Sequence, residues 1–591
     1  MKYKLFNGQN YSPRTQILFN RGIGLDYIDE WLNAGWDDIS SPWSFGGDKV
    51  RHAIRLINEA VLNNDEIWVL VDCDADGFTS AAIIINYLYE MYSDEENTFD
   101  IKNKLHYILH TGKQHGLEDV LYQFPDNCLI ILPDSSTNDT AEMRLLLDTK
   151  NCSIVCLDHH EADTYLEDEE NLVIINNQIS DYPNKDLSAA GVVWQICRAY
   201  DKIFETDIAN EYIDLAALGC LSDMMDYRSI ETKAIVSLGL ANIKNPFFYY
   251  MTEKNKYSID TKMGGINYMS MAFYVTPFIN AIVRSGTMEE KDLVFKSFLT
   301  MYAFEKVESG KRGHKGELVP RVEEAVRIAT NVKARQTKSQ NSAMELFEKR
   351  IREQSLLENA IIVLQCEPGE VEKNIAGLVA NKIQAKYQHP CLVLTKSQTT
   401  DDNEPFYRGS ARNYSMSENQ DLRSTCLETD LIEYAQGHAN AFGISIAESN
   451  IDSFIEKTNS LYEQVEKEPV YWVDFIWKKN QIDNNTILDI ARNKDFWGQE
   501  VPEPYVAVER INLSTCNIQL LSPDKHPTIK IHLDNGVDIM KFKSSQEEYE
   551  EFTKPNQTLT AVCRCAENVW NGNSTPQLII EDFELREEWI F

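Results

Sequence analysis

The sequence lacks several features that would place it in common classes of protein. No apolar run approaches the roughly 20 residues needed to span a bilayer, so we expect no membrane partner. The 12 cysteines form no CxxC pair, which argues against a zinc ribbon and a disulfide scaffold. Reduced, buried thiols are typical of a cytoplasmic protein, and that is the compartment we expect. No repeat of fixed period is present, which excludes a solenoid.

Basic residues are scarce. The 57 Lys and Arg face 92 Asp and Glu, which gives a formal net charge of −35. This balance argues against a surface that binds nucleic acid over its whole area, although it allows a local basic groove. The chain has 591 residues, of which 43% are hydrophobic and 10% aromatic. Such a composition excludes a collagen-like or largely disordered chain and predicts several folded domains.

Short apolar stretches alternate with helical patterns in the first half of the chain. Buried strands are predicted at 66–72, 128–133, 153–158 and 172–176, and helices at 79–92, 188–200 and 211–223. This alternation predicts an α/β fold with a parallel sheet. A polar connector and a smaller α/β unit follow, and β-rich segments from about residue 468 predict an OB-like β-barrel.

The most distinctive local motif follows the first predicted strand. Asp72, Asp74 and Asp76 alternate along the chain and are followed by Gly77. Three such carboxylates can supply the oxygen ligands that Mg²⁺ or Mn²⁺ prefers. An EF-hand loop begins similarly, but it requires a Glu at its twelfth position, where this chain has Ile83. Taken alone, the motif could equally be a solvated acidic turn.

Polar residues also follow the other predicted elements. Asp134 follows the strand at 128–133, Asp158-His159-His160 ends the strand at 153–158, and Asp223 follows an apolar helix. Carboxyl ends of parallel strands meet at one edge of a sheet, where ligands gather. Imidazole among carboxylates suits Mn²⁺ better than Ca²⁺, and several carboxylates suit two ions that share a ligand. We therefore predict a site for two divalent metal ions, with Mn²⁺ preferred and Mg²⁺ as the alternative.

In this order, the motifs resemble those of the DHH phosphoesterase superfamily, and further segments resemble its RecJ exonucleases. FNRGI, SAAGVVW and PFINAIVRSG are similar to RecJ segments, and GLVANK, GSARN and QGHANAFG are similar to the associated DHHA1 domain. WGQEVPEP and NVWNGNSTPQL resemble the RecJ barrel, which shorter DHH phosphodiesterases lack. The resemblance covers nearly the whole chain.

The sequence patterns and the resemblance together predict five parts. They are an N-terminal helical segment at 1–60, a DHH catalytic domain at 61–300, a helical connector at 301–355, a DHHA1 domain at 356–465 and an OB-like nucleic-acid-binding domain at 466–591.

The resemblance also implies a set of metal ligands. The ligands expected for two ions are Asp74, Asp76, Asp134, His159 and Asp223. Asp134 would bridge the ions, and Asp72 would either bind the first ion or orient its ligands.

Other residues are expected to act on the phosphate. By the same resemblance, Asp158 would hold His159, and His160 would face the scissile phosphate. Arg284 and Asn280 would clamp that phosphate, since the planar guanidinium suits phosphate geometry. In isolation, Arg284 would instead be an ordinary helix-surface residue and Asn280 a helix cap.

The second domain is expected to hold the strand end. Ser410 and Arg412 resemble the family's phosphate anchors, Gly437 and His438 lie nearby by the same analogy, and Arg408 is in the same motif. A tight structural turn is the alternative for Gly437 and His438.

One stretch departs from the family pattern. Where RecJ proteins carry an Arg that helps to bind the 5′ phosphate, this chain has His110, with Lys113 close by. Both are candidate substrate-binding residues, and dependence on a 5′ phosphate stays open.

The leading hypothesis is a monomeric exonuclease that degrades single-stranded DNA from its 5′ end in recombination or repair, by two-metal phosphodiester hydrolysis. RNA is an alternative substrate, and a single-strand-binding protein or a helicase is a candidate partner. The alternatives are a DHH phosphodiesterase acting on short RNA or signalling dinucleotides, and a non-catalytic replication scaffold. The predicted barrel argues against the first alternative, and the complete ligand set argues against the second.

Overall fold

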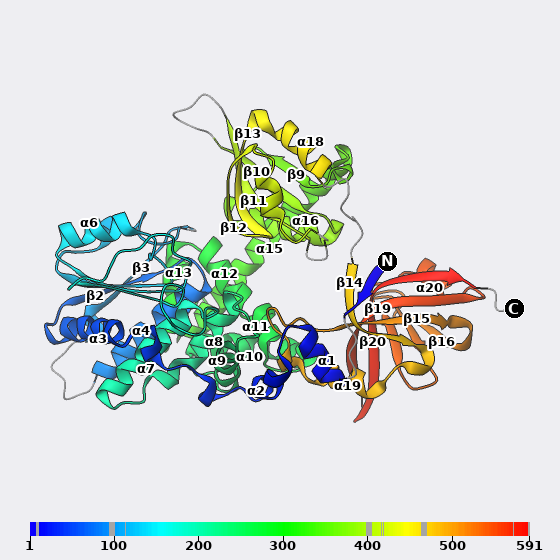
Figure 1. Cartoon of the computed structure of the whole chain (residues 1–591), viewed down its shortest axis with the longest axis horizontal. Helices are drawn as coiled ribbons and strands as arrows, with labels where there is room; N and C mark the ends of the chain where they lie inside the picture. Colours follow the sequence, from blue (N-terminus) through cyan, green and yellow to red (C-terminus); the bar gives the residue numbers. More distant parts are fainter. Residues whose placement is uncertain are drawn as a thin grey trace. The chain divides into compact units, whose positions relative to one another are not determined.

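The computed structural model describes residues 1–6, 11–93, 101–112, 114–397, 405–414, 417, 419–461, 470–570 and 572–588. The chain divides into two units, each built from segments that are far apart in sequence (Figure 1). Unit 1 comprises residues 1–20, 335–493 and 503–591, and unit 2 comprises residues 21–334 and 494–502.

Unit 2 is built around a sheet of five parallel strands in the order β3-β2-β4-β5-β6. The strands are β2 (Glu66–Val71), β3 (Leu105–Leu109), β4 (Cys128–Pro133), β5 (Ser153–Asp158) and β6 (Leu172–Asn176). Every residue of β4 and β6 is buried, as expected for a parallel sheet covered on both faces. The predicted parallel α/β fold is confirmed.

Helices cover this sheet and extend unit 2 beyond it. Those packed against strands include α3 (Gly47–Leu62), α4 (Ala75–Tyr92), α6 (Thr140–Lys150) and α7 (Ala189–Phe204). The others before the connector are α2 (Ile28–Leu32), α5 (Ile101–Lys104), α8 (Ile213–Ser222), α9 (Ile230–Ala241), α10 (Pro246–Met263), α11 (Tyr268–Tyr274), α12 (Thr276–Ser285), α13 (Met288–Phe298) and α14 (Thr300–Ala303). Helix α4 is apolar almost all round, which suits its buried position between the sheet and helices α7 and α8.

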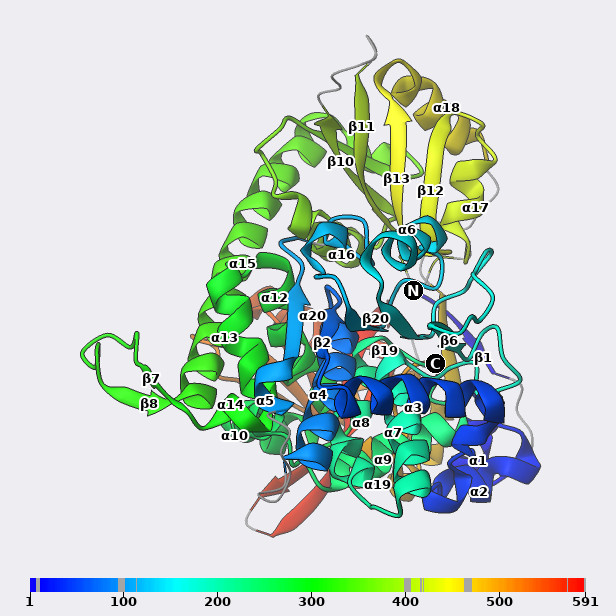
Figure 2. The same cartoon turned by 90° about the vertical axis from the view of Figure 1, so that its left-hand side faces the viewer.

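The connector is only partly helical. It begins with a hairpin of β7 (Lys306–Glu308) and β8 (Leu318–Pro320), which stands away from α10 and α14 in Figure 2. The long helix α15 (Arg321–Glu353) follows. The hairpin was not predicted, because its strands have three residues each and too short a pattern to recognise.

Unit 1 contains two further sheets. The first has the order β12-β13-β11-β10-β9 and is formed by β9 (Ile362–Cys366), β10 (Cys391–Ser397), β11 (Phe406–Arg412), β12 (Ile432–His438) and β13 (Ala441–Ala447). Its helices are α16 (Ala376–Tyr387), α17 (Leu422–Leu427) and α18 (Ile451–Leu461). Only β9 and β10 run parallel, and the other neighbours are antiparallel.

The second sheet of unit 1 has the order β1-β14-β15-β19-β20-β18-β17-β16. Its strands are β1 (Lys2–Leu5), β14 (Val470–Lys478), β15 (Tyr505–Asn512), β16 (Asn517–Leu521), β17 (Thr528–His532), β18 (Asp538–Lys541), β19 (Gln557–Trp570) and β20 (Asn573–Glu587). The helices α1 (Pro13–Asn20), α19 (Asn484–Arg492) and α20 (Gln546–Phe552) accompany it. This sheet corresponds to the predicted OB-like domain.

The N-terminus differs from the helical segment expected at 1–60. Residues Lys2–Leu5 form a strand that pairs in parallel with Val470–Val473 of β14. Four residues carry too little periodicity to be recognised as a strand, and the partner lies far along the chain, so the sequence pattern could not reveal the pairing.

Lys233 provides a test of packing in unit 2. It is buried, and its ammonium lies over the rings of Trp31 and Tyr227 and donates to the backbone oxygen of Asp495 at 2.9 Å. Burial lowers its pKa to about 8, whereas an unfolded lysine titrates near pH 10.4. The unfolded state therefore binds more protons between these values, so the contribution of Lys233 to stability rises with pH across that window.

We expect wild type to gain about 2 kcal/mol of unfolding free energy relative to Lys233→Met between pH 7 and about pH 10. Urea denaturation of both proteins at a series of pH values measures this difference. Parallel pH curves would contradict the assignment.

No helix among the described residues is long and apolar enough to cross a membrane.

Candidate metal centre and substrate-binding residues

The predicted polar residues lie where strands of unit 2 end. Asp72 follows β2, Asp134 follows β4, and Asp158 is the last residue of β5. Asp134 adopts a left-handed backbone with φ of 64°, and its N–H donates to the oxygen of Leu157 at 3.0 Å. The parallel sheet therefore brings residues from separate motifs to one edge.

The DxDxDG motif forms a tight turn from β2 into α4. Asp74 caps the helix, and its Oδ1 accepts from the backbone N–H groups of Asp76 at 2.8 Å and Gly77 at 3.0 Å. A Cβ on Gly77 would lie 2.7 Å from the backbone of Asp72. The glycine is therefore required by the close approach of the helix to the strand end.

Asp76 is held by the N-terminus of α7. Its Oδ2 accepts from the N–H of Ala189 at 2.8 Å, and its Oδ1 accepts from the N–H of Ala190 at 3.1 Å. Burial, followed by the nearby charge of Asp74, raises the pKa of Asp76 to about 7. A Cβ on Gly219 of α8 would lie only 2.3 Å from Asp76 Oδ1, so a residue without a side chain is needed there.

His159 lies at the centre of a carboxylate cluster. Its Nε2 is 3.3 Å from Asp134 Oδ1, 3.4 Å from Asp223 Oδ2 and 3.9 Å from Asp76 Oδ2. Burial lowers the pKa of His159 to about 4, so the imidazole is neutral at pH 7. Burial also raises the pKa values of Asp134 and Asp223 well above the ordinary range, with repulsion from Asp76 as the next cause.

This cluster fits the divalent ions predicted from the sequence. Asp134 Oδ2 and His159 Nε2 are buried and make no hydrogen bond among the described residues. Buried polar atoms normally have a hydrogen-bond partner. Both of these atoms carry lone pairs, so a bound cation would supply the partner that each one lacks. Asp76, His159 and Asp223 form a group within ligating distance of one another, as do Asp134, His159 and His160. Oxygen donors with imidazole suit Mn²⁺ and also admit Mg²⁺.

Asp158 organises the two histidines. Its Oδ1 accepts from the backbone N–H groups of His159 at 2.7 Å and His160 at 3.2 Å, and lies 2.8 Å from His160 Nδ1. Burial opposes the charge of Asp158, but the hydrogen bond and charge of His160 outweigh it and lower its pKa. Burial likewise opposes the charge of His160, whose bond to Asp158 nevertheless raises its pKa to about 9. His160 remains half-exposed and presents a cationic ring edge to solvent.

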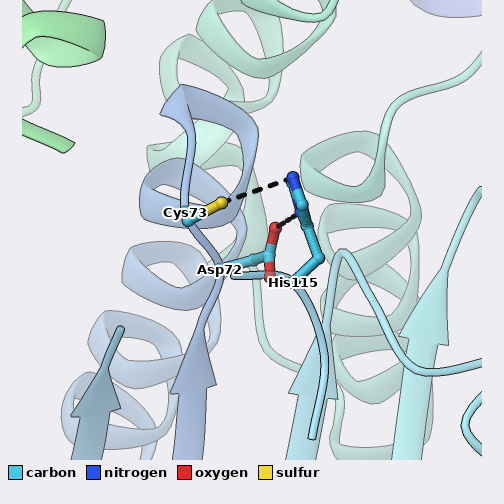
Figure 3. A group of neighbouring side chains, drawn as sticks. All are labelled: Asp72, Cys73 and His115. Carbon is cyan, nitrogen blue, oxygen red and sulfur yellow. Dashed lines mark hydrogen bonds and ion pairs between the residues drawn. The ribbon is translucent and has the colours of Figure 1, made fainter. Parts of the chain in front are cut away.

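Asp72 does not join the cluster around His159. Its Oδ2 lies 2.5 Å from His115 Nδ1, and Cys73 Sγ lies 3.3 Å from His115 Nε2 (Figure 3). The hydrogen bond to Asp72 is the main cause that raises the pKa of His115 to about 11. A role for Asp72 as a ligand of the catalytic ions stays a prediction.

His110 and Lys113 were candidates for substrate binding. The structure buries His110, whose Nδ1 bonds to Asp119 at 2.9 Å and whose Nε2 lies 3.6 Å from Asp72 Oδ1. Lys113 lies outside the described residues. The contact of either residue with substrate stays a prediction.

Asn280 and Arg284 lie on α12 and are half-buried. Helix α12 packs against α4 and α8, the two helices whose ends carry Asp74 and Asp223. The phosphate contacts of Asn280 and Arg284 stay predictions.

In unit 1, the predicted phosphate anchors lie at one end of a sheet. A Cβ on Gly377, in the first turn of α16, would lie 2.7 Å from Arg412 Nη2 and 3.4 Å from Ser410 Oγ. Arg412 pairs with Ala441 of β13, which in turn pairs with His438 of β12. Arg412 and His438 therefore lie at the same sheet end.

The two further candidates of unit 1, Gly437 and Arg408, lie on strands β12 and β11 of the same sheet. Gly437 has φ of 125°, and its backbone oxygen accepts from Arg423, while Arg408 on β11 is exposed. The positive φ of Gly437 shows that the backbone itself requires a glycine there, whatever its part in binding.

The sequence patterns missed His115, Cys73 and Asn176. Asn176 ends β6 and donates to the backbone oxygen of His160 at 2.9 Å, so it supports the loop that presents that ring. Its place at a strand end was a usable signal. The meeting of Cys73 with His115 across 42 residues left no signal in the pattern.

Comparisons with known proteins show which protein families have these features. A family model described as "DHH family, N-terminal domain" matches residues 66–220, and one described as "RecJ OB domain" matches residues 473–582. The crystal structure of RecJ from Thermus thermophilus in complex with Mn²⁺ has a TM-score of 0.66 at 19% identity, covering 91% of this chain and 72% of that one. These matches identify a DHH-family domain and a RecJ OB domain on a fold that RecJ shares.

Relatives that are similar in sequence indicate the family. A Bacillus subtilis (strain 168) protein named as a putative SPbeta prophage-derived single-strand DNA-specific exonuclease, YorK, is 31% identical over 593 residues, covering 99% of this chain and 98% of that protein. The single-stranded-DNA-specific exonuclease RecJ of the same organism is 23% identical over 562 residues, which cover 94% of this chain and 65% of that protein. The chain belongs to the RecJ family of exonucleases.

Proposed function

We propose that this chain hydrolyses single-stranded DNA from its 5′ end, using two divalent ions with Mn²⁺ preferred. The proposal rests on two buried atoms, Asp134 Oδ2 and His159 Nε2. They lie among carboxylates and make no hydrogen bond among the described residues. The relative at 31% identity, named as a single-strand DNA-specific exonuclease, supports the substrate class. RecJ structures that contain Mn²⁺ or Mg²⁺ support the choice of metals.

Some residues of the site would hold the metal ions, and others would contact the phosphate. Asp76, Asp134, His159 and Asp223 would hold the ions, with Asp74 on the adjoining turn. Divalent ions bound there supply a water of lowered pKa and neutralise charge on the phosphate. His160, fixed through Nδ1 by Asp158, offers its other ring nitrogen to a phosphate oxygen. Asp158 fixes both the position and the charge of that ring.

The remaining candidates would bind phosphates of the substrate. Arg284 and Asn280 would hold the scissile phosphate, and Ser410 and Arg412 would bind a phosphate of the strand beside the N-terminus of α16. With a net charge of −35, most of the surface repels a polyanion, so binding is confined to a few basic positions. A single strand needs fewer such contacts along its path than a duplex, which favours single-strand specificity.

The test compares substrates and label positions. With Mn²⁺, we expect a long single strand labelled at its 5′ end to release labelled mononucleotides or short oligonucleotides at once. The 3′-labelled strand should lose its label only late in the time course. Blunt duplex DNA should be cut at least about tenfold more slowly at moderate salt, because the acidic surface repels it.

Asp134→Asn serves as the inactive control in this assay. Immediate release from the 3′ label would overturn the polarity, and equal rates on duplex would overturn the single-strand specificity. Faster cleavage of RNA or of dinucleotides would favour the other DHH phosphodiesterases.

A further inference from the structure

A thiol, an imidazole and a carboxylate meet at the end of β2 (Figure 3). Cys73 Sγ lies 3.3 Å from His115 Nε2, and Asp72 Oδ2 lies 2.5 Å from His115 Nδ1. Three groups among the described residues could hold a metal ion, and this is the one that contains a cysteine. The mechanism proposed above uses neither Cys73 nor His115.

The donor set differs in kind from the one around His159. Thiolate and imidazole are softer ligands than carboxylates, and together they select Zn²⁺ over Mn²⁺ or Mg²⁺. In a tetrahedral zinc site, a sulfur at about 2.3 Å and a nitrogen at about 2.0 Å from the metal lie about 3.5 Å apart. The separation of 3.3 Å between Cys73 Sγ and His115 Nε2 is close to that value. Asp72 holds the other ring nitrogen of His115, as a carboxylate commonly does behind a zinc-bound histidine.

A second observation points to a missing ligand at the same place. His110 is only 2% exposed, and its Nε2 makes no hydrogen bond among the described residues. That nitrogen lies 3.6 Å from Asp72 Oδ1, the carboxylate oxygen that His115 does not bond. A buried ring nitrogen without a partner normally requires a metal ion, a water or a polar group.

The cluster is also accessible. The side chain of His115 is 58% exposed, so an ion can enter from solvent on the side of His115 even though Cys73 is buried. The identity and spacing of the two ligand atoms, the carboxylate behind His115 and the entry path agree with a metal site, and water would complete the coordination of the ion.

We propose that Cys73, His115 and Asp72 form a Zn²⁺ site separate from the hard-cation cluster at His159, with the ring nitrogen of His110 beside it. Zn²⁺ displaces the protons held by His115 Nε2 and Cys73 Sγ, and these protons are released to solvent. No oxidation or reduction is involved.

Occupancy of this site bears on the neighbouring cluster. Cys73 lies between Asp72 and Asp74 in the turn that leads to Asp76, and Asp74 caps α4. Pulling Cys73 toward a zinc ion shifts this turn and with it the hard-cation ligands. Zn²⁺ therefore inhibits hydrolysis, an arm of the inference that rests on the proposed function.

Binding is tested without any nuclease assay. Metal-free full-length protein, kept in excess Mg²⁺ to occupy oxygen-rich sites, is titrated with Co²⁺ as a spectroscopic probe and with Zn²⁺ in competition with a chromophoric chelator. With Co²⁺, wild type should show a thiolate-to-cobalt charge-transfer band. One equivalent of Zn²⁺ should bind at the same site and remove the band. Cys73→Ser should lose the band, and both Cys73→Ser and His115→Gln should weaken Zn²⁺ binding about tenfold or more.

The matched control is Cys516→Ser, which removes a partly exposed thiol of unit 1 that contacts no histidine in the part of the chain described. It should keep the band and the affinity. Thermal unfolding of each variant checks that it folds. Absence of the band in folded wild type, or its persistence in Cys73→Ser, would overturn the site.

A second measurement tests the inhibition. Micromolar Zn²⁺ should slow Mn²⁺-activated hydrolysis by wild type and by Cys516→Ser, and Cys73→Ser should resist it. Equal inhibition of wild type and Cys73→Ser would overturn the inhibitory role. If wild type hydrolyses no nucleic acid, the proposed function fails, and the charge-transfer band still decides whether the zinc site exists.

Discussion

Asp134→Asn should lower the rate of Mn²⁺-dependent hydrolysis about 10³-fold or more while leaving the fold intact. Asp134 follows β4, its buried Oδ2 has no partner among the described residues, and its Oδ1 lies 3.3 Å from His159 Nε2. An amide of the same shape removes the negative charge that would hold the cations and leaves the packing unchanged. Single-turnover assays on a labelled single strand measure the loss.

The choice of asparagine follows from the backbone. Asp134 has φ of 64°, a conformation that Asn tolerates and that costs an alanine roughly 1 kcal/mol or more. Asp134→Ala therefore mixes strain with loss of the ligand. Asp226→Asn is the matched control, because Asp226 lies near Asp223 in sequence but pairs with Arg228. It should keep nearly full activity, and full activity in Asp134→Asn would eliminate Asp134 as a ligand.

In the absence of metal, we do not expect Asp134→Asn to lower the free energy of unfolding, although it lowers activity. Burial, followed by repulsion from the neighbouring carboxylates, raises the pKa of Asp134 well above its usual range, and without metal this repulsion remains. Asp134→Asn should therefore be at least as stable as wild type without metal. Mn²⁺ should raise the unfolding midpoint of wild type more than that of the variant, since a ligand stabilises the state that binds it. An equal gain in both proteins would contradict a metal site at Asp134.

Gly219→Ala should lower activity about 100-fold, although the substitution lies in a helix and adds one methyl group. The new Cβ would lie 2.3 Å from Asp76 Oδ1 and 2.4 Å from the Cβ of Ala190. Asp76 would be pushed off the amides of Ala189 and Ala190 that hold it at the start of α7. The Mn²⁺ concentration that gives half-maximal rate should rise as well.

Helix propensity predicts the reverse for this substitution. In an exposed helix, Gly→Ala stabilises by roughly 1 kcal/mol, so a loss of stability and activity would point to the contact with Asp76. Ser222→Ala, three residues along α8, is the control and should change the rate little, because Ser222 bonds only to the backbone oxygen of Gly219 among the hydrogen bonds described. Normal metal dependence in Gly219→Ala would show that Asp76 can move without consequence.

The strands that could be predicted best from the sequence are those buried on both faces of the sheet. β4 and β6 are buried throughout, and such apolar runs stand out in the sequence. β3 lies at the edge of the same sheet and is only partly buried, so His106 and Tyr107 interrupt its pattern and the strand was not predicted. The pairing of β1 with β14 depends on tertiary contacts that no local pattern encodes.

The candidate site was predictable for the same reason and within the same limit. Asp134 and His159 follow recognisable strands, so the topology of a parallel sheet brings them together. His115 follows the strand that was not predicted, and its approach to Cys73 depends on where β3 lies beside β2. Roles that depend on bound substrate, such as those of Arg284 and Arg412, stay predictions.

The interleaving of the two units affects how the protein can be made and cut. The chain passes from one unit to the other at residues 20/21, 334/335, 493/494 and 502/503. Unit 2 is therefore complete only when residues 494–502 have been synthesised, and β1 must wait for β14. Folding of both units during translation is consequently finished late. For the same reason, one proteolytic cut cannot release either unit whole, and a catalytic fragment that ends at residue 334 would lack a segment of its own unit.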